Sequence, residues 1–125
     1  MLSALPWVAG AGAVGAVARW GLTRATSSWD ICGLPLGVTV VNVLGCLLAG
    51  AFFGWSIPRT GLSPEVKLAV LVGFLGSFTT FSAMAGEAVT LISDGRPAAA
   101  ALHLVLQNVL GVLAFLAGWW VSHRF

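Results

Sequence analysis

Charge is what this sequence has least of. Only 8% of its 125 residues are charged, whereas 58% are hydrophobic, and the mean hydropathy is +0.98. In a soluble domain of this length, about a quarter of the residues are charged. A surface so poor in charge could not stay dissolved in water, but it suits lipid. The composition therefore excludes a soluble domain and indicates an integral protein of the lipid bilayer.

Basic clusters and cysteine frameworks are also lacking. The net charge of +2 is small and no cluster of Lys and Arg occurs, so we expect no nucleic-acid partner. Two cysteines, Cys32 and Cys46, provide neither a disulfide framework nor the spacing of metal ligands. No catalytic triad, metal cluster or phosphate-binding loop is recognisable, so we do not expect an enzyme.

The chain consists mainly of long apolar runs, separated by short segments rich in Gly, Pro, Ser and Asp that favour loops. The four runs cover about 5–23, 34–57, 66–92 and 98–121. Each has roughly the 20 residues that a helix needs to cross a bilayer. We therefore expect an all-α membrane protein, with residues 1–125 forming one domain of four transmembrane helices.

The ends and the small residues of these runs agree with that prediction. The first run lacks a basic start and a cleavage site, so we expect a helix and not a signal peptide. Gly50-x-x-x-Gly54 in the second run predicts close approach of two helix backbones. The tryptophans lie near run ends, as in an interfacial belt: Trp7, Trp20, Trp29, Trp55, Trp119 and Trp120.

Positive charges are balanced between the two ends of such a bundle. Arg59, Lys67 and Arg124 would lie at one end, and Arg19, Arg24 and Arg96 at the other. Orientation normally follows an excess of Lys and Arg on the cytoplasmic side, and here there is none. One hypothesis is insertion in both orientations to form an antiparallel dimer. The alternative is a weak bias, decided by one residue or by insertion order.

Polar residues inside the runs are costly in lipid and mark pathways or helix contacts. The amide of Asn42 could donate to an anion or form an interhelical hydrogen bond. Two glycines, two serines and two threonines gather in Gly73–Ser82, and all are poor helix formers. We expect the third helix to be broken mid-membrane there, with freed carbonyls lining a cavity or holding a cation.

Phenylalanines follow helical spacing through the same stretch, at Phe74, Phe78 and Phe81. The positive edge of an aromatic ring can face an anion. Core packing is the alternative explanation for such a stripe.

Three motifs together resemble the CrcB/Fluc fluoride channel family. They are Gly73-Phe74-x-Gly76-x-x-Thr79-Thr80-Phe81-Ser82, Val41-Asn42-x-x-Gly45 and Gly15-Ala16-x-x-Arg19. The resemblance implies an antiparallel, dual-topology homodimer in the bacterial plasma (inner) membrane. It also implies passive fluoride export that reduces cytoplasmic fluoride toxicity, and a structural sodium ion at the dimer centre.

The same resemblance implies roles for individual residues. Backbone carbonyls of Gly76 and Thr79 would hold the sodium ion. The residues implied for the fluoride pore are the amide of Asn42, the ring of Phe81, the hydroxyl of Ser82, the neighbouring Thr80 and Phe78, and Arg19 near the aqueous vestibule.

The chain departs from the family at several pore positions. Met84 replaces a second phenylalanine, and a thioether is polarisable but has no positive ring edge. Val38 stands where the family has threonine. His103 and Gln107 replace a tyrosine and a serine, so the polar track is rebuilt. His103 could make conduction pH-sensitive or could be a hydrogen-bonded helix contact. Glu87 has no assigned role and could reach for water or Arg96.

Two alternatives to a self-sufficient fluoride channel remain open at this point. A small dual-topology multidrug exporter has a similar architecture, but it needs a buried carboxylate in the first helix, which this chain lacks. A non-conducting subunit of a heterodimeric fluoride channel is compatible with the departures at Met84 and Val38.

The balanced charges lead to a test of orientation. With both native cysteines replaced, single cysteines placed between Arg59 and Pro64 should be labelled from both sides of intact cells. Adding two or three lysines to one end should force one orientation. Labelling from one side only would rule out the antiparallel dimer.

Overall fold

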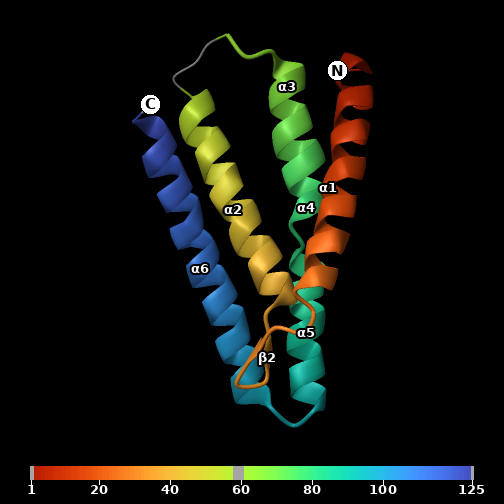
Figure 1. Ribbon diagram of the computed structural model, residues 1–125, viewed down its shortest axis with the longest axis vertical. Helices are drawn as coiled ribbons and strands as arrows, with labels where there is room; N and C mark the ends of the chain where they lie inside the picture. Colours follow the sequence, from red (N-terminus) through yellow and green to blue (C-terminus); the bar gives the residue numbers. More distant parts are fainter. Residues whose placement is uncertain (1, 58–60, 125) are drawn as a thin grey trace.

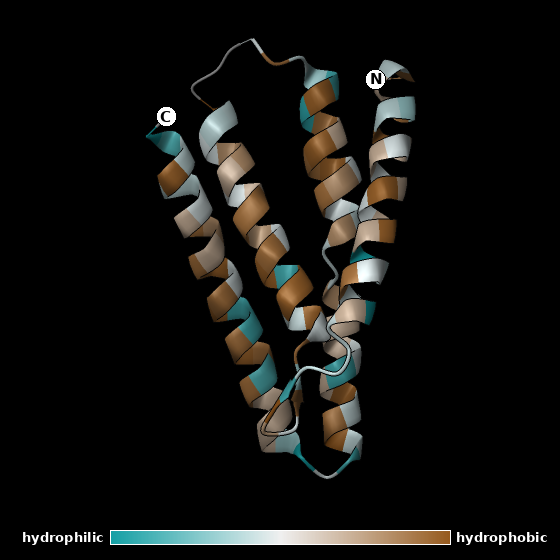
Figure 2. Cartoon of the chain, viewed as in Figure 1, coloured by the Kyte–Doolittle hydropathy of each residue, from teal (hydrophilic) through white to brown (hydrophobic). Residues whose placement is uncertain are grey.

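The computed structural model describes residues 2–57 and 61–124, so Pro58 and Arg59 lie outside the described part. It contains four spans long and apolar enough to cross a membrane, at 2–25, 37–56, 64–93 and 97–123 (Figure 1). The four predicted helical runs are thereby confirmed. Figure 2 shows hydrophobic residues over most of each span, with hydrophilic ones also along the lower part of α6.

Three of the spans contain one long helix each. The first span is a short 3₁₀ turn, η1 (Leu2–Ala4), followed by α1 (Leu5–Ala25). The second is α2 (Gly37–Ser56) and the fourth is α6 (Pro97–His123). Proline near the first position begins α6, where its missing N–H costs no hydrogen bond.

The third span is divided into four segments. It starts with α3 (Pro64–Leu68) and continues as the π-helical η2 (Ala69–Leu75). A single turn, α4 (Gly76–Phe78), follows, and α5 (Phe81–Ser93) completes the span. The side chain of Ser63 caps α3 by accepting from the N–H of Val66 at 3.4 Å.

The first connection differs from the predicted loop. Helix α1 extends to Ala25, so Arg24 is helical, and a small antiparallel hairpin follows, formed by β1 (Asp30–Ile31) and β2 (Leu34–Pro35). Cys32 and Gly33 both have positive φ, 54° and 77°, which gives the tight turn of a two-residue hairpin. The carboxylate of Asp30 accepts from the N–H of Gly33 at 2.7 Å and stabilises this turn.

The helices pack in two main pairs. Helix α2 lies along α6, and α1 lies along η2 and α4, while α5 packs against α6 (Figure 1). A β-carbon at Gly50 would collide with the backbone of Phe115, and one at Gly54 would lie 3.1 Å from the Cα of Trp119. The predicted close approach at Gly50 and Gly54 is therefore confirmed, and α6 is the helix that approaches.

This contact predicts a stability difference between two glycines. Gly50→Ala should lower the free energy of unfolding by ~1–3 kcal/mol, because the added methyl group overlaps the α6 backbone. Gly10→Ala is the matched control, since no atom lies within 4 Å of its β-carbon position. Thermal unfolding in detergent measures both variants. Equal stability of the two would show that α2 and α6 separate without cost.

Candidate functional site

The third span leaves the helical conformation at two threonines. Helix α4 ends at Phe78, and Thr79 and Thr80 have extended backbone, with ψ values of 158° and 112°. Helix α5 then begins at Phe81, capped by Thr80, whose hydroxyl accepts from the N–H of Ala83 at 3.2 Å. β-Branched side chains favour extended backbone, and threonine is a good N-cap. The Thr79-Thr80 pair therefore ends one helix and begins the next.

This interruption diverts backbone hydrogen bonds of the third span. In a continuous α-helix, the carbonyls of Gly76 and Thr79 would accept from the N–H groups of Thr80 and Ala83. Here the N–H of Thr80 donates to Asn42 Oδ1 at 2.8 Å, and that of Ala83 donates to a threonine hydroxyl. The carbonyls of Gly76 and Thr79, which the family resemblance predicts to hold a cation, are therefore among those that lose their helical donors at the interruption.

Asn42 of α2 pairs with both backbone groups of Thr80. Its Oδ1 accepts from the N–H of Thr80, and its Nδ2 donates to the carbonyl of the same residue at 3.1 Å. The second hydrogen of Nδ2 is donated to Gln107 Oε1 at 2.9 Å. Asn42 is thus an interhelical contact, and both of its amide hydrogens are occupied.

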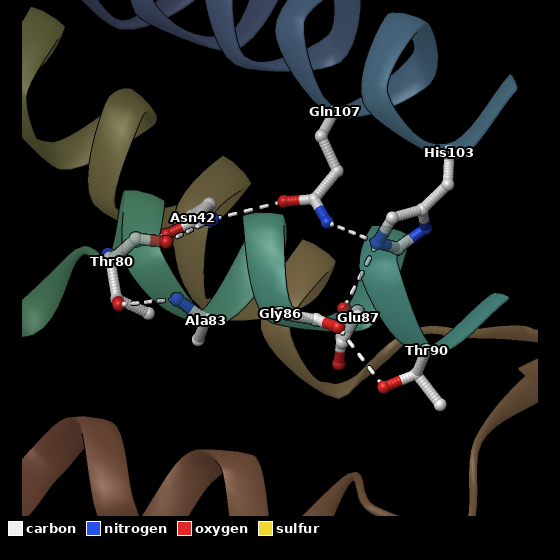
Figure 3. A network of polar contacts seen from close by, with 8 residues as sticks. All are labelled: Asn42, Thr80, Ala83, Gly86, Glu87, Thr90, His103 and Gln107. Carbon is white, nitrogen blue, oxygen red and sulfur yellow. Dashed lines mark hydrogen bonds and ion pairs between the residues drawn. The ribbon is translucent and has the colours of Figure 1, made fainter. Parts of the chain in front are cut away.

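The polar contacts continue from Gln107 along α6 to α5 (Figure 3). Gln107 Nε2 lies 2.8 Å from His103 Nε2, which lies 3.0 Å from Glu87 Oε2. His103 is only 2% exposed, so this is a buried helix contact. The i, i+4 spacing of His103 and Gln107 places both on one helix face, a signal that the sequence already carried.

The suggestion that Glu87 reaches Arg96 is wrong. The guanidinium of Arg96 donates to the carbonyls of Gly33 and Cys32 at 2.8 and 3.1 Å. Its planar fork matches two successive carbonyls of the hairpin turn. Glu87 therefore pairs with His103 instead, across the α5–α6 contact.

Two open cavities meet at Thr80, which lines both. One, of about 280 Å³, is bordered by Asn42, Phe81, Met84 and Gln107. The other, of about 490 Å³, is bordered by predicted site residues Arg19 and Ser82, and also by Val38. The hydroxyls of Thr80 and Ser82 are 3.2 Å apart. Most of the predicted pore residues therefore gather around the helix interruption.

The hydrophobic residues of the predicted site occupy different environments. Phe81 is 76% exposed, whereas Met84 is 5% exposed. Phe78 is buried and stacks on Phe74, with ring centroids 5.6 Å apart, and it borders neither of the two cavities. Gly76 and Thr79 line a further cavity of about 250 Å³ beside α2.

Four apolar spans, with buried polar contacts at the interruption of the third, define a small multi-pass membrane protein. Residues 6–119 match the family described as "CrcB-like protein, Camphor Resistance (CrcB)", so the chain belongs to this family. The family resemblance seen in the motifs is thereby confirmed.

Three relatives are similar over nearly the whole chain, and each is named "Fluoride-specific ion channel FluC". The protein from Nitrosococcus oceani is 39% identical, with 98% of both chains covered. That from Maridesulfovibrio salexigens is 37% identical over 90% of this chain and 89% of the relative. That from Desulforapulum autotrophicum is 40% identical over 90% of each.

The pairing of Asn42 with Thr80 predicts a specific cost for one substitution. Asn42→Asp places an acceptor opposite the carbonyl of Thr80 and Gln107 Oε1, so the free energy of unfolding should fall by ~1–3 kcal/mol. Acidic pH should restore part of this loss, because a protonated carboxyl can donate once.

Asn108→Asp is the matched control for this measurement. Asn108 is an exposed residue of α6 at the edge of the same cavity as Asn42, and among the described residues its side chain donates to the carbonyl of Leu104 in its own helix, at 2.7 Å. Thermal unfolding at neutral and acidic pH compares the two variants. Equal losses would mean that the pairing with Thr80 contributes nothing specific.

Proposed function

We propose that this chain forms a fluoride-selective channel that exports fluoride passively across the bacterial plasma membrane. Three relatives at 37–40% identity, each named "Fluoride-specific ion channel FluC", support the proposal. The observation that carries it is the cavity at the helix interruption, where Asn42, Phe81 and Gln107 come together.

The chemistry of these residues suits a small, strongly hydrated anion. A selective pore must replace the hydration shell of its ion with protein groups. Hydroxyls of Thr80 and Ser82 can donate to an anion, and the ring of Phe81 supplies a positive edge. The amides of Asn42 and Gln107 are further donors once they are released from their present hydrogen-bond partners. Arg19 borders the second cavity, where it would attract anions from the aqueous phase.

The working form that we propose is an antiparallel homodimer. Phe81 leaves most of its ring outside the single chain, next to the cavity that it lines. A second copy would provide the missing wall of this open cavity. The three-to-three balance of Lys and Arg agrees with insertion in both orientations.

A sodium ion at the centre of this dimer would use the carbonyls of Gly76 and Thr79. The residues present fit such an ion, because the helical donors of both carbonyls are diverted and unwound backbone carbonyls bind Na⁺. The ion would supply a fixed positive charge, which offsets the cost of an anion in a medium of low dielectric constant.

The two alternatives are less well supported. An exporter would need a buried carboxylate in the first helix, and the only candidate on the third span, Glu87, pairs with His103. The presence of Met84 in place of a family phenylalanine is compatible with a non-conducting subunit of a heterodimer. The efflux experiment below distinguishes such a subunit from a channel.

Liposomes that contain only this purified protein provide the test. After loading with potassium fluoride, they should empty when a potassium ionophore is added, while chloride-loaded liposomes should retain their anion. Protein-free liposomes control for leakage through lipid. Equal release of chloride would contradict selectivity, and no release of either anion would favour the non-conducting subunit.

A further inference from the structure

The buried polar contacts form a chain with a definite direction. It begins at the backbone of Thr80, which requires Asn42 to point Oδ1 at the N–H and Nδ2 at the carbonyl. Nδ2 therefore also faces Gln107, where only Oε1 can accept from it. The donor side of the Gln107 amide, Nε2, is left facing His103 (Figure 3).

The two neighbours of His103 Nε2 require different protonation states of this nitrogen. An amide nitrogen only donates, so His103 Nε2 must carry no hydrogen where Gln107 Nε2 meets it. Glu87 Oε2 lies 3.0 Å from the same ring nitrogen, and an ionised carboxylate would need a donor there. The donor-to-acceptor direction of this series of hydrogen bonds therefore requires that Glu87 carry a proton. Gln107 Nε2 and the protonated Glu87 then compete as donors for one lone pair of His103 Nε2.

The same geometry leaves Asn42 no donor for an anion. Both hydrogens of Nδ2 are occupied, one by the carbonyl of Thr80 and one by Gln107 Oε1. The backbone bond belongs to the helix interruption and cannot be given up cheaply. Release of Asn42 toward the cavity that it shares with Gln107 therefore depends on Gln107.

We propose that Gln107 turns its amide over to create an anion site between its own Nε2 and Nδ2 of Asn42. One proton moves from Glu87 Oε2 to His103 Nε2 across their contact, which leaves a carboxylate and an imidazolium and conserves their total charge. The new Nε2–H of His103 donates to Glu87 and to Gln107 Oε1. Gln107 Nε2 and Asn42 Nδ2 then converge as two donors, and a small acceptor-only ion such as fluoride satisfies both. This inference rests on the proposed channel function.

The surrounding charges leave Glu87 as the proton partner of His103. Helix α2 carries no charged residue over Gly37–Ser56. On the α5–α6 side, Asp94 and Arg96 line a cavity of about 450 Å³ with Glu87, but Arg96 is bonded to the hairpin carbonyls. In the described part of the chain, neither Asp94 nor Arg96 forms a hydrogen bond with the His103 ring.

Nitrogen NMR of His103 tests the proposal directly. His123→Gln leaves His103 as the single histidine, and this variant should conduct as the unmodified protein does. With ¹⁵N-labelled histidine, sodium fluoride should move the Nε2 resonance from the unprotonated to the protonated range. Sodium chloride at equal ionic strength should not. The infrared carbonyl band of protonated Glu87, identified by its loss in Glu87→Gln, should decrease in parallel.

Gln107→Glu provides a second measurement. A carboxylate at this position accepts from both Asn42 and His103. All hydrogen bonds in the series are then formed, and no donor is left for an anion. His103 Nε2 should then be protonated without fluoride, and fluoride efflux should fall about tenfold or more, while thermal stability is retained.

The outcomes separate this inference from the channel proposal. An unchanged Nε2 resonance at saturating fluoride, in protein whose efflux is normal, would overturn the turning of Gln107 alone. Unimpaired efflux from Gln107→Glu would do the same. No efflux from the unmodified protein would overturn the channel proposal and this inference with it.

Discussion

The pairing of one side-chain amide with one backbone unit is the interaction on which the site depends. A helix interrupted within an apolar span exposes an N–H and a carbonyl that lipid cannot satisfy. Asn42 satisfies both groups of Thr80 from a neighbouring helix. Because this contact ties α2 to the start of α5, it also fixes where the cavities beside Thr80 lie.

Close helix packing makes this pairing geometrically accessible. Glycines bring the backbones of α2 and α6 together, so α2 and α6 act as one unit that presents Asn42 and Gln107 side by side. The hydroxyl of Thr80 supports the other side of the interruption by capping α5. Small residues and capping side chains are therefore as much a part of the site as the amides.

Two of the departures read from the family resemblance, His103 and Gln107, contact each other in the structure. His103 and Gln107, which stand where the family has a tyrosine and a serine, form a continuous set of contacts from Asn42 to Glu87. A carboxylate in an apolar span is costly unless it has a partner, and His103 provides one. His103 and Gln107 thus connect Glu87 to the polar network, a contact that its position in the sequence did not suggest.

The sequence by itself determined the four spans, because run length and apolarity are local properties that a bilayer reads directly. Glycine, serine and β-branched residues at 73–82 oppose a regular helix, and the extended backbone of Thr79 and Thr80 lies within this stretch. The close approach at Gly50 followed from spacing, although spacing does not name the partner helix. The motifs identified the family, and with it the candidate pore residues.

Only the tertiary structure decided how these residues are joined. From the sequence, Asn42 could be an anion donor or a helix contact, and Arg96 was a possible partner of Glu87. The answer depended on which helices are neighbours, because hydrogen bonds require partners within about 3 Å and residues 38 to 65 positions apart meet only after packing. The burial of Phe78 and the exposure of Phe81 were decided in the same way, by the turn between α4 and α5.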